Sequence, residues 1–140
     1  ALQLAQAYST LGNGGRMNPV SLVALESPVE GRQVIAPDTA TAVRRMLEEV
    51  VRPGGTGMKA AVQGYRVAGK TGTAWKFAAG GYSEDKYISI FAGLAPASDP
   101  RLATVVVIDP VKTGASGTAT TVVVSPAPST KATSSGSILP

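Results

Sequence analysis

A lysine set among glycines and hydroxyl residues is the part of this 140-residue sequence most suited to chemistry; it lies in the stretch GKTGT at 69–73. Two chemistries use such a lysine. Residues 64–71 fit the phosphate-binding loop pattern G-x-x-x-x-G-K-T, and Lys70-Thr71-Gly72 fits the K-T-G box of certain serine acyl-transfer enzymes. Because the two chemistries need different folds, the surrounding residues can decide between them.

The neighbouring residues favour a strand over a phosphate-binding loop. Such a loop must lead into a helix whose first turn faces the anion. The residues after Lys70 have no helical repeat and include Gly80-Gly81, while Tyr65 and Val67 suit an extended strand. The nucleotide chemistry would also need a carboxylate that binds Mg²⁺, and Asp109 is only a weak candidate for it. Nucleotide binding therefore stays as the alternative hypothesis.

The composition excludes several other functions. Thirteen basic and nine acidic residues give a net charge of +4, and the charges are scattered without interleaved aromatics, so we expect no nucleic-acid partner. The sequence has no histidine and no cysteine, so we expect no metal or other cofactor, and Ser-His and Cys-His catalysis is excluded within it. No apolar run is long enough to cross a membrane.

The first part of the chain predicts two helices and two strands. Residues 1–12 carry a helical repeat, 17–25 and 32–35 read as strands, and a second helix is expected from an N-cap at Asp38 to about Val51. A further helical turn is expected in 56–62. The charged residues of the second helix are predicted to form a solvated face with i,i+4 ion pairs: Arg44, Arg45, Glu48 and Glu49.

The second part predicts an antiparallel meander followed by a tail. Strands are expected at 65–76, 87–94 and 102–108, joined by short turns, and the continuous apolar run of the last one suits burial on both faces. Residues 111–140 are rich in Ser, Thr, Gly, Ala and Pro, which predicts a low-complexity, disordered tail after a domain spanning 1–110.

Several longer stretches resemble one family. These are LQLAQAYSTLGNGG, the helix ending in RPGGTG, GYRVAGKTGTAWK and YISIFAGLAPASDPRLATVVVID, in this order. Over about residues 1–110 the sequence resembles the transpeptidase domain of class B penicillin-binding proteins, the division-specific peptidoglycan D,D-transpeptidases in particular. The resemblance implies an α+β class, as a partial penicillin-binding/β-lactamase-like fold with an antiparallel sheet flanked by helices. It places the K-T-G box on the strand that walls the active-site cleft.

The resemblance also implies roles for individual residues. Lys70 would assist proton transfer to the leaving group, and the backbone N–H of Thr73 would donate one hydrogen bond of the oxyanion hole. Thr71, Gly72 and Thr73 would bind a stem peptide ending in D-Ala-D-Ala, since hydroxyls and a cation suit its carboxylate and a glycine permits close approach. Tyr82 and Tyr87 would flank a loop at the edge of the cleft.

The family's setting is implied as well. The parent protein would act at the periplasmic face of the bacterial inner membrane, with peptidoglycan stem peptides as substrates. Its complete domain would bind β-lactams, and cell-division proteins would be its partners.

The sequence does not have the family's nucleophilic serine at its usual place, upstream of the K-T-G box. The family acylates a Ser-x-x-Lys serine and uses a Ser-x-Asn motif, both upstream of the box. Here Ser-x-x-Lys occurs only at 83–86, after the box and in an expected loop, and Ser-x-Asn does not occur. We therefore expect the chain to be part of a longer protein and unable to form an acyl-enzyme alone. A carboxypeptidase, a β-lactamase and a non-catalytic binding remnant remain alternatives.

The tail departs from the family pattern, which continues with a Tyr-Gly-Gly segment and a C-terminal helix packed on the sheet. A shifted reading frame is one hypothesis, because the codons of Thr120–Val123 permit Tyr-Tyr-Gly-Gly in another frame. Without that helix, one face of the strand at 102–108 would lack its cover, and the isolated chain would be poorly stable.

Overall fold

The fold is a layer of helices on an antiparallel sheet. The computed structural model describes residues 1–21, 23, 26–27, 29–78, 81–109 and 118–124. Its elements are α1 (Leu2–Gly12), β1 (Arg16–Met17), β2 (Arg32–Gln33), α2 (Pro37–Leu47), the 3₁₀ helices η1 (Glu48–Val51) and η2 (Met58–Ala60), β3 (Ala68–Ala78), β4 (Gly81–Ala95), β5 (Leu102–Asp109) and β6 (Thr118–Val124).

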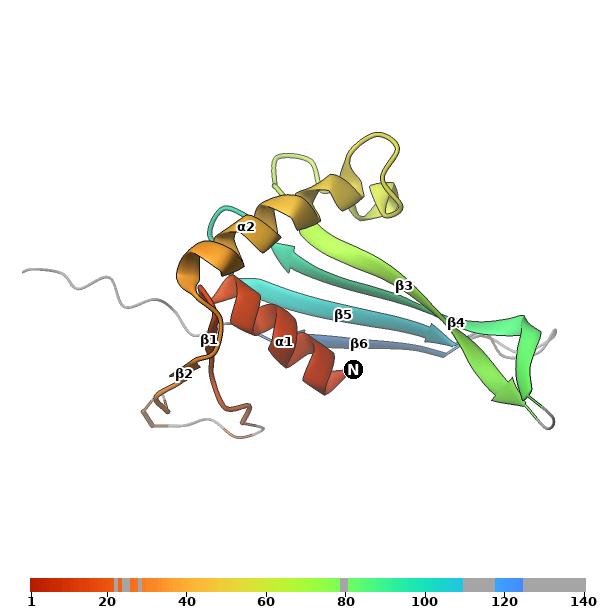
Figure 1. Cartoon of the computed structure of the whole chain (residues 1–140), viewed down its shortest axis with the longest axis horizontal. Helices are drawn as coiled ribbons and strands as arrows, with labels where there is room; N and C mark the ends of the chain where they lie inside the picture. Colours follow the sequence, from red (N-terminus) through yellow and green to blue (C-terminus); the bar gives the residue numbers. More distant parts are fainter. Residues whose placement is uncertain (22, 24–25, 28, 79–80, 110–117, 125–140) are drawn as a thin grey trace, which may run out of the picture.

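In the described part of the chain, the main sheet has four antiparallel strands in the order β3-β4-β5-β6, and β1 and β2 form a separate short pair. Figure 1 shows α1 lying across one face of this sheet, with the strands extending beyond the helix. The predicted α+β class, with an antiparallel meander and flanking helices, is confirmed.

The core forms where α1 meets the middle of the sheet. Ala5 of α1 is fully buried and packs with Ala92 and Val105 of β4 and β5. Tyr8 packs beside them, and its burial raises the pKa of the phenol above its ordinary value. The small side chains on both elements let the helix approach the sheet closely, which makes the core thin.

β5 is not buried on both faces, so that prediction is wrong. Ala103 and Val105 face α1 and are fully buried, whereas Leu102 and Ile108, on the other face, are 47% and 48% exposed. The residues of β5 favour a strand whichever face they point to, which explains the continuous apolar run. In the described part of the chain, however, α1 covers only one face of this strand.

A strand also forms in the segment expected to be a disordered tail. Thr118–Val124 pairs along β5 from Asp109↔Thr118 to Ala103↔Val124. Six of its seven residues are threonine or valine, which favour extended backbone at a sheet edge. The prediction of disorder is therefore wrong for 118–124, and the remainder of the tail lies outside the described residues.

Several predicted boundaries shift for local reasons. β1 ends at Met17 rather than residue 25, because Pro19 has no N–H for a ladder; residues 22, 24 and 25 are not among those described. α2 begins at Pro37 with Ala36 as N-cap, so Asp38 lies in the first turn instead of capping the helix. β3 starts at Ala68, after a turn in which Gly64 adopts a φ of +81°.

None of the helices within the described ranges has the length and apolarity needed to cross a membrane.

Candidate active-site strand

Lys70, Thr71, Gly72 and Thr73 all lie inside β3, in an unbroken ladder with β4 that runs from Ala68↔Leu94 to Trp75↔Tyr87. β3 is the first strand of the sheet, so its other edge carries no described strand. In an edge strand, alternate backbone N–H and C=O groups point away from the ladder and can pair with an added peptide.

This placement rules against the phosphate-binding loop. A loop of that kind needs Lys70 and Thr71 at a loop-to-helix junction, where backbone N–H groups converge on the anion. Both residues instead lie in the middle of a strand, and the next element along the chain is strand β4. Asp109, the weak magnesium candidate, forms an ion pair with Lys76. The nucleotide-binding alternative is wrong.

The four residues divide between the two faces of the strand. Lys70 and Gly72 pair with Ala92 and Ile90, which lie on the side of α1. Thr71 and Thr73 point to the opposite side, as side chains alternate along a strand. A ligand at the free edge is therefore flanked by the ammonium on one side and by the hydroxyls on the other.

Hydrogen bonds orient the side chains of two of these four residues, Lys70 and Thr71. Lys70 is exposed, and its Nζ donates to the carbonyl oxygen of Thr71 at 2.8 Å. The hydroxyl of Thr71 lies 2.7 Å from the hydroxyl of Thr56. Thr56 was not identified from the sequence, because its distance along the chain from the K-T-G box carries no periodic signal. The exposed ammonium can turn toward a carboxylate at the cost of one hydrogen bond.

The face that carries Thr71 and Thr73 is hollowed on both sides of them. One hollow of ≈480 Å³ lies between the segment 55–60 and the side chains of Thr71, Phe91 and Val106. A second, of ≈250 Å³, is lined by Thr71, Gly72 and Thr73 together with residues of β4 and β5. Both are open and largely apolar, so the polar groups of the site are concentrated at the edge of β3.

The two glycines of the GKTGT stretch, Gly69 and Gly72, have different surroundings, which gives a testable pair of substitutions. A Cβ on Gly69 would lie 2.6 Å from the carbonyl oxygen of Ala92 and 2.7 Å from the ring of Phe91, whereas one on Gly72 would meet nothing closer than Ile90 at 3.8 Å. We expect Gly69→Ala to lower the free energy of unfolding by about 1–3 kcal/mol and Gly72→Ala to leave it nearly unchanged. Urea unfolding of the two variants measures this, and equal losses in both would contradict it.

The Ser-x-x-Lys sequence at 83–86 lies within β4, not in a loop as expected. Tyr87 also belongs to β4 and makes an edge-to-face contact with Trp75, with ring centroids 6.1 Å apart. Trp75 thus packs across the strands, and the loop expected between Tyr82 and Tyr87 is part of strand β4 instead. Tyr82 is in the same strand. A serine in a strand lacks the helix start that the family's nucleophile uses.

Comparison with known proteins identifies the family. The model of the penicillin-binding protein transpeptidase domain matches residues 1–127. The chain is 47% identical over 113 residues to the peptidoglycan D,D-transpeptidase FtsI of Escherichia coli (strain K12), covering 81% of this chain and 19% of that protein. It is 44% identical over 108 residues to the probable peptidoglycan D,D-transpeptidase PenA of Neisseria meningitidis, covering 77% of this chain and 19% of that protein.

A solved structure agrees with this assignment. The transpeptidase domain of Burkholderia pseudomallei penicillin-binding protein 3 superposes with a TM-score of 0.72 at 44% identity, over 81% of this chain and 35% of that one. The chain thus spans about a fifth of the length of its curated relatives. It belongs to the penicillin-binding protein transpeptidase domain family, among the peptidoglycan D,D-transpeptidases.

Proposed function

We propose that this chain supplies the K-T-G strand of a peptidoglycan D,D-transpeptidase and binds the C-terminal carboxylate of a stem peptide ending in D-Ala-D-Ala. The observation that carries the proposal is the placement of Lys70, Thr71 and Thr73 along the free edge of β3. A peptide laid along this edge can pair with the backbone while its carboxylate meets an ammonium and two hydroxyls.

In the proposed reaction a serine Oγ attacks the carbonyl carbon of the penultimate D-Ala, and the bond to the terminal D-Ala breaks. The backbone N–H of Thr73 donates to the oxyanion that forms, and Lys70 assists proton transfer to the departing amine. An amine of a second stem peptide then attacks the acyl-enzyme, which releases the serine and forms the cross-link. β-Lactams would acylate the same serine.

The nucleophilic serine is proposed to come from outside these 140 residues. The one Ser-x-x-Lys sequence here belongs to strand β4, and Ser-x-Asn is missing from the whole sequence. By itself the chain would bind the peptide end without acylation. In the complete protein, the reaction would take place at the periplasmic face of the inner membrane, together with cell-division proteins.

Labelling with fluorescent penicillin, followed by a denaturing gel, tests the proposal. The 140-residue chain alone is expected to take no label. A chimera in which it replaces the matching 113 residues of Escherichia coli FtsI is expected to be labelled. Labelling of the isolated chain would show that a serine within it is the nucleophile. A folded chimera without label would contradict the assignment of this strand.

The molecule that accepts the acyl group distinguishes a transpeptidase from the two other enzymatic alternatives, a carboxypeptidase and a β-lactamase. With a D-Ala-D-Ala peptide and a second peptide amine, the chimera is expected to form the cross-linked product. Release of D-Ala without cross-linking would favour a carboxypeptidase, and rapid hydrolysis of the bound penicillin would favour a β-lactamase.

A further inference from the structure

A basic hollow lies beside the helical segment that precedes β3, apart from the K-T-G residues. It has a volume of ≈180 Å³ and is lined by Thr41, Arg44, Arg45, Glu48, Arg66, Ala97 and Ser98. The first four come from one face of α2 and its continuation in η1, at positions i, i+3, i+4 and i+7. Three guanidinium groups and one carboxylate give the lining a formal charge of +2.

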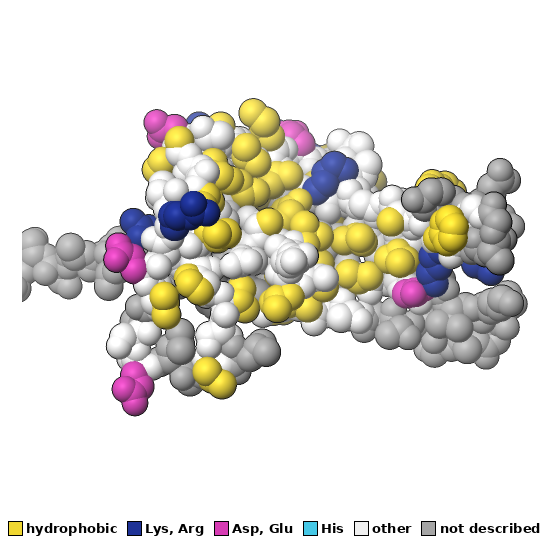
Figure 2. All heavy atoms as spheres, turned by 60° about the horizontal axis from the view of Figure 1, so that its bottom comes forward, with side chains coloured by type: hydrophobic (Ala, Val, Ile, Leu, Met, Phe, Trp, Pro, Cys, Tyr) yellow, Lys and Arg dark blue, Asp and Glu magenta, His cyan; other side chains and the backbone are white. Residues whose placement is uncertain are grey.

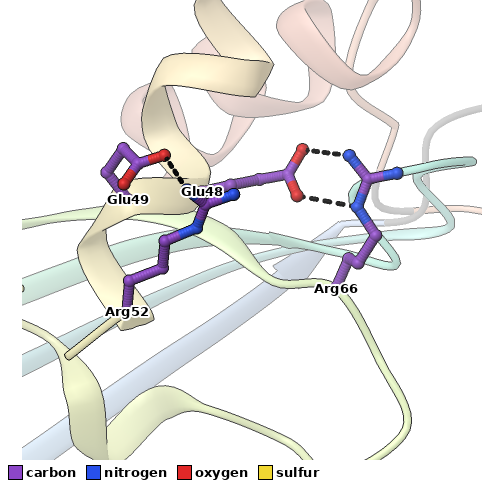
Figure 3. Close-up of polar contacts among 4 residues, drawn as sticks. All are labelled: Glu48, Glu49, Arg52 and Arg66. Carbon is purple, nitrogen blue, oxygen red and sulfur yellow. Dashed lines mark hydrogen bonds and ion pairs between the residues drawn. The ribbon is translucent and has the colours of Figure 1, made fainter.

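The carboxylates of this helix are directed away from its arginines. The sequence predicted ion pairs at i,i+4 between Arg44, Arg45, Glu48 and Glu49, and none of them forms. Glu48 instead accepts two hydrogen bonds from Arg66, both 2.7 Å long, and Glu49 pairs with Arg52 at 2.7 Å, as Figure 3 shows. The tertiary contact with Arg66 takes the carboxylate that would otherwise neutralise an arginine of the helix.

Two arginines of the hollow consequently lack a carboxylate partner among the described residues. Arg44 donates from Nη1 to the carbonyl oxygen of Gly12 at 3.3 Å, while its Nε is buried without a hydrogen-bond partner among the described residues. Arg45 is exposed, and its side chain has no ion pair or hydrogen bond within the described part of the chain. A buried N–H donor without an acceptor is costly. Arg44 and Arg45 both line the hollow, so an anion in it would lie beside two guanidinium groups that have no carboxylate partner among the described residues.

We propose that this hollow binds a phosphate group through Arg44 and Arg45, with the hydroxyls of Thr41 and Ser98 as further donors. Guanidinium groups match the oxygens of phosphate in paired hydrogen bonds better than an ammonium does. The volume lies below the about 300–1,000 Å³ of sites for drug-sized ligands, which suits a single small oxyanion. The group can belong to a free phosphate ion or to a phospholipid headgroup.

The site is independent of the proposed transpeptidase function. None of Lys70, Thr71 and Thr73 lines the hollow. Loss of the phosphate site would therefore leave the peptide site intact, and failure of the penicillin-labelling test would not bear on phosphate binding.

Titration of the 140-residue chain with sodium phosphate, against sodium chloride at equal ionic strength, tests the proposal by calorimetry. We expect saturable binding of phosphate and none of chloride. Arg45→Ala is expected to weaken it by about tenfold or more, since one charged hydrogen-bond partner is lost. The matched control is Arg52→Ala, which removes the same charge from a residue that does not line the hollow. Its affinity is expected to stay within about twofold of the parent value.

Two further measurements complete the experiment. Ser98→Ala, on an exposed position of the hollow, is expected to weaken phosphate binding without changing the circular dichroism spectrum. Flotation with phosphatidylglycerol vesicles, compared with phosphatidylcholine vesicles, distinguishes the sources: binding that depends on Arg45 indicates a lipid headgroup, and binding of inorganic phosphate alone indicates the free ion. No phosphate effect beyond that of chloride, or equal weakening by Arg45→Ala and Arg52→Ala, would overturn the proposal.

Discussion

Leu94→Ala is expected to leave the chain unfolded at about 25 °C. Leu94 is 1% exposed and is one of the two largest fully buried side chains of the described residues. It packs in a cluster with Ala68, Ala97 and Ala103, against Tyr8, Leu11 and Leu47. Truncation of a buried leucine costs about 2–5 kcal/mol, because the apolar surface is lost and a cavity remains.

The loss of the Leu94 side chain is expected to unfold the chain because the core is thin. Most of the buried hydrophobic residues described here are alanines, which contribute little burial each. Hydrophobic side chains also stay exposed across the sheet, as the middle of Figure 2 shows. A small domain of ordinary stability has only about 5–15 kcal/mol in total, and we expect this chain to have less.

Circular dichroism during heating and in urea measures both effects. Leu102→Ala is the matched control, since Leu102 lies in the same sheet but is 47% exposed, and its loss is expected to shift stability by about 0.5 kcal/mol or less. A Leu94→Ala variant that melts at the parent midpoint would show that the core lies elsewhere. A sharp cooperative melt of the parent chain at high temperature would contradict its expected low stability.

Lys70→Ala is expected to lower the rate of penicillin acylation by about 100-fold or more in the Escherichia coli FtsI chimera. The substitution removes the ammonium proposed to attract the carboxylate and to assist proton transfer. Within the described ranges its exposed side chain bonds only to the adjacent Thr71 carbonyl, so the fold is expected to survive. Lys70→Arg is expected to restore binding in part but not the rate, as guanidinium does not release its proton.

The rate of fluorescent penicillin labelling, with the thermal midpoint of each variant, checks this prediction. Arg32→Ala removes the same charge from the exposed strand β2 and is expected to leave the rate unchanged. If Lys70→Ala labelled at the parent rate, as Arg32→Ala is expected to, Lys70 would have only a structural role. If Lys70→Ala and Arg32→Ala slowed the labelling equally, the effect would come from net charge and not from the position of the ammonium.

Much of the architecture could be predicted from local pattern. The apolar repeat of 1–12 gave the position of α1, and the alternation in 87–94 gave the central strand β4. The residues around Lys70 were sufficient to choose a strand over a phosphate-binding loop, because Tyr65, Val67 and the following glycines suit no helix start. Boundaries were less accurate where proline and glycine act on the backbone, as at Pro37 and Gly64.

The sequence by itself determined the family, the antiparallel meander and the strand that carries Lys70, Thr71 and Thr73. These depend on residue type, spacing and order along the chain, which are local quantities. Only the tertiary structure decided that β5 is covered on one face, that Thr118–Val124 adds a fourth strand, and that Glu48 pairs with Arg66 instead of its helical neighbours. Burial and ion pairing depend on which distant segment comes close, and periodicity along one element carries no information about that.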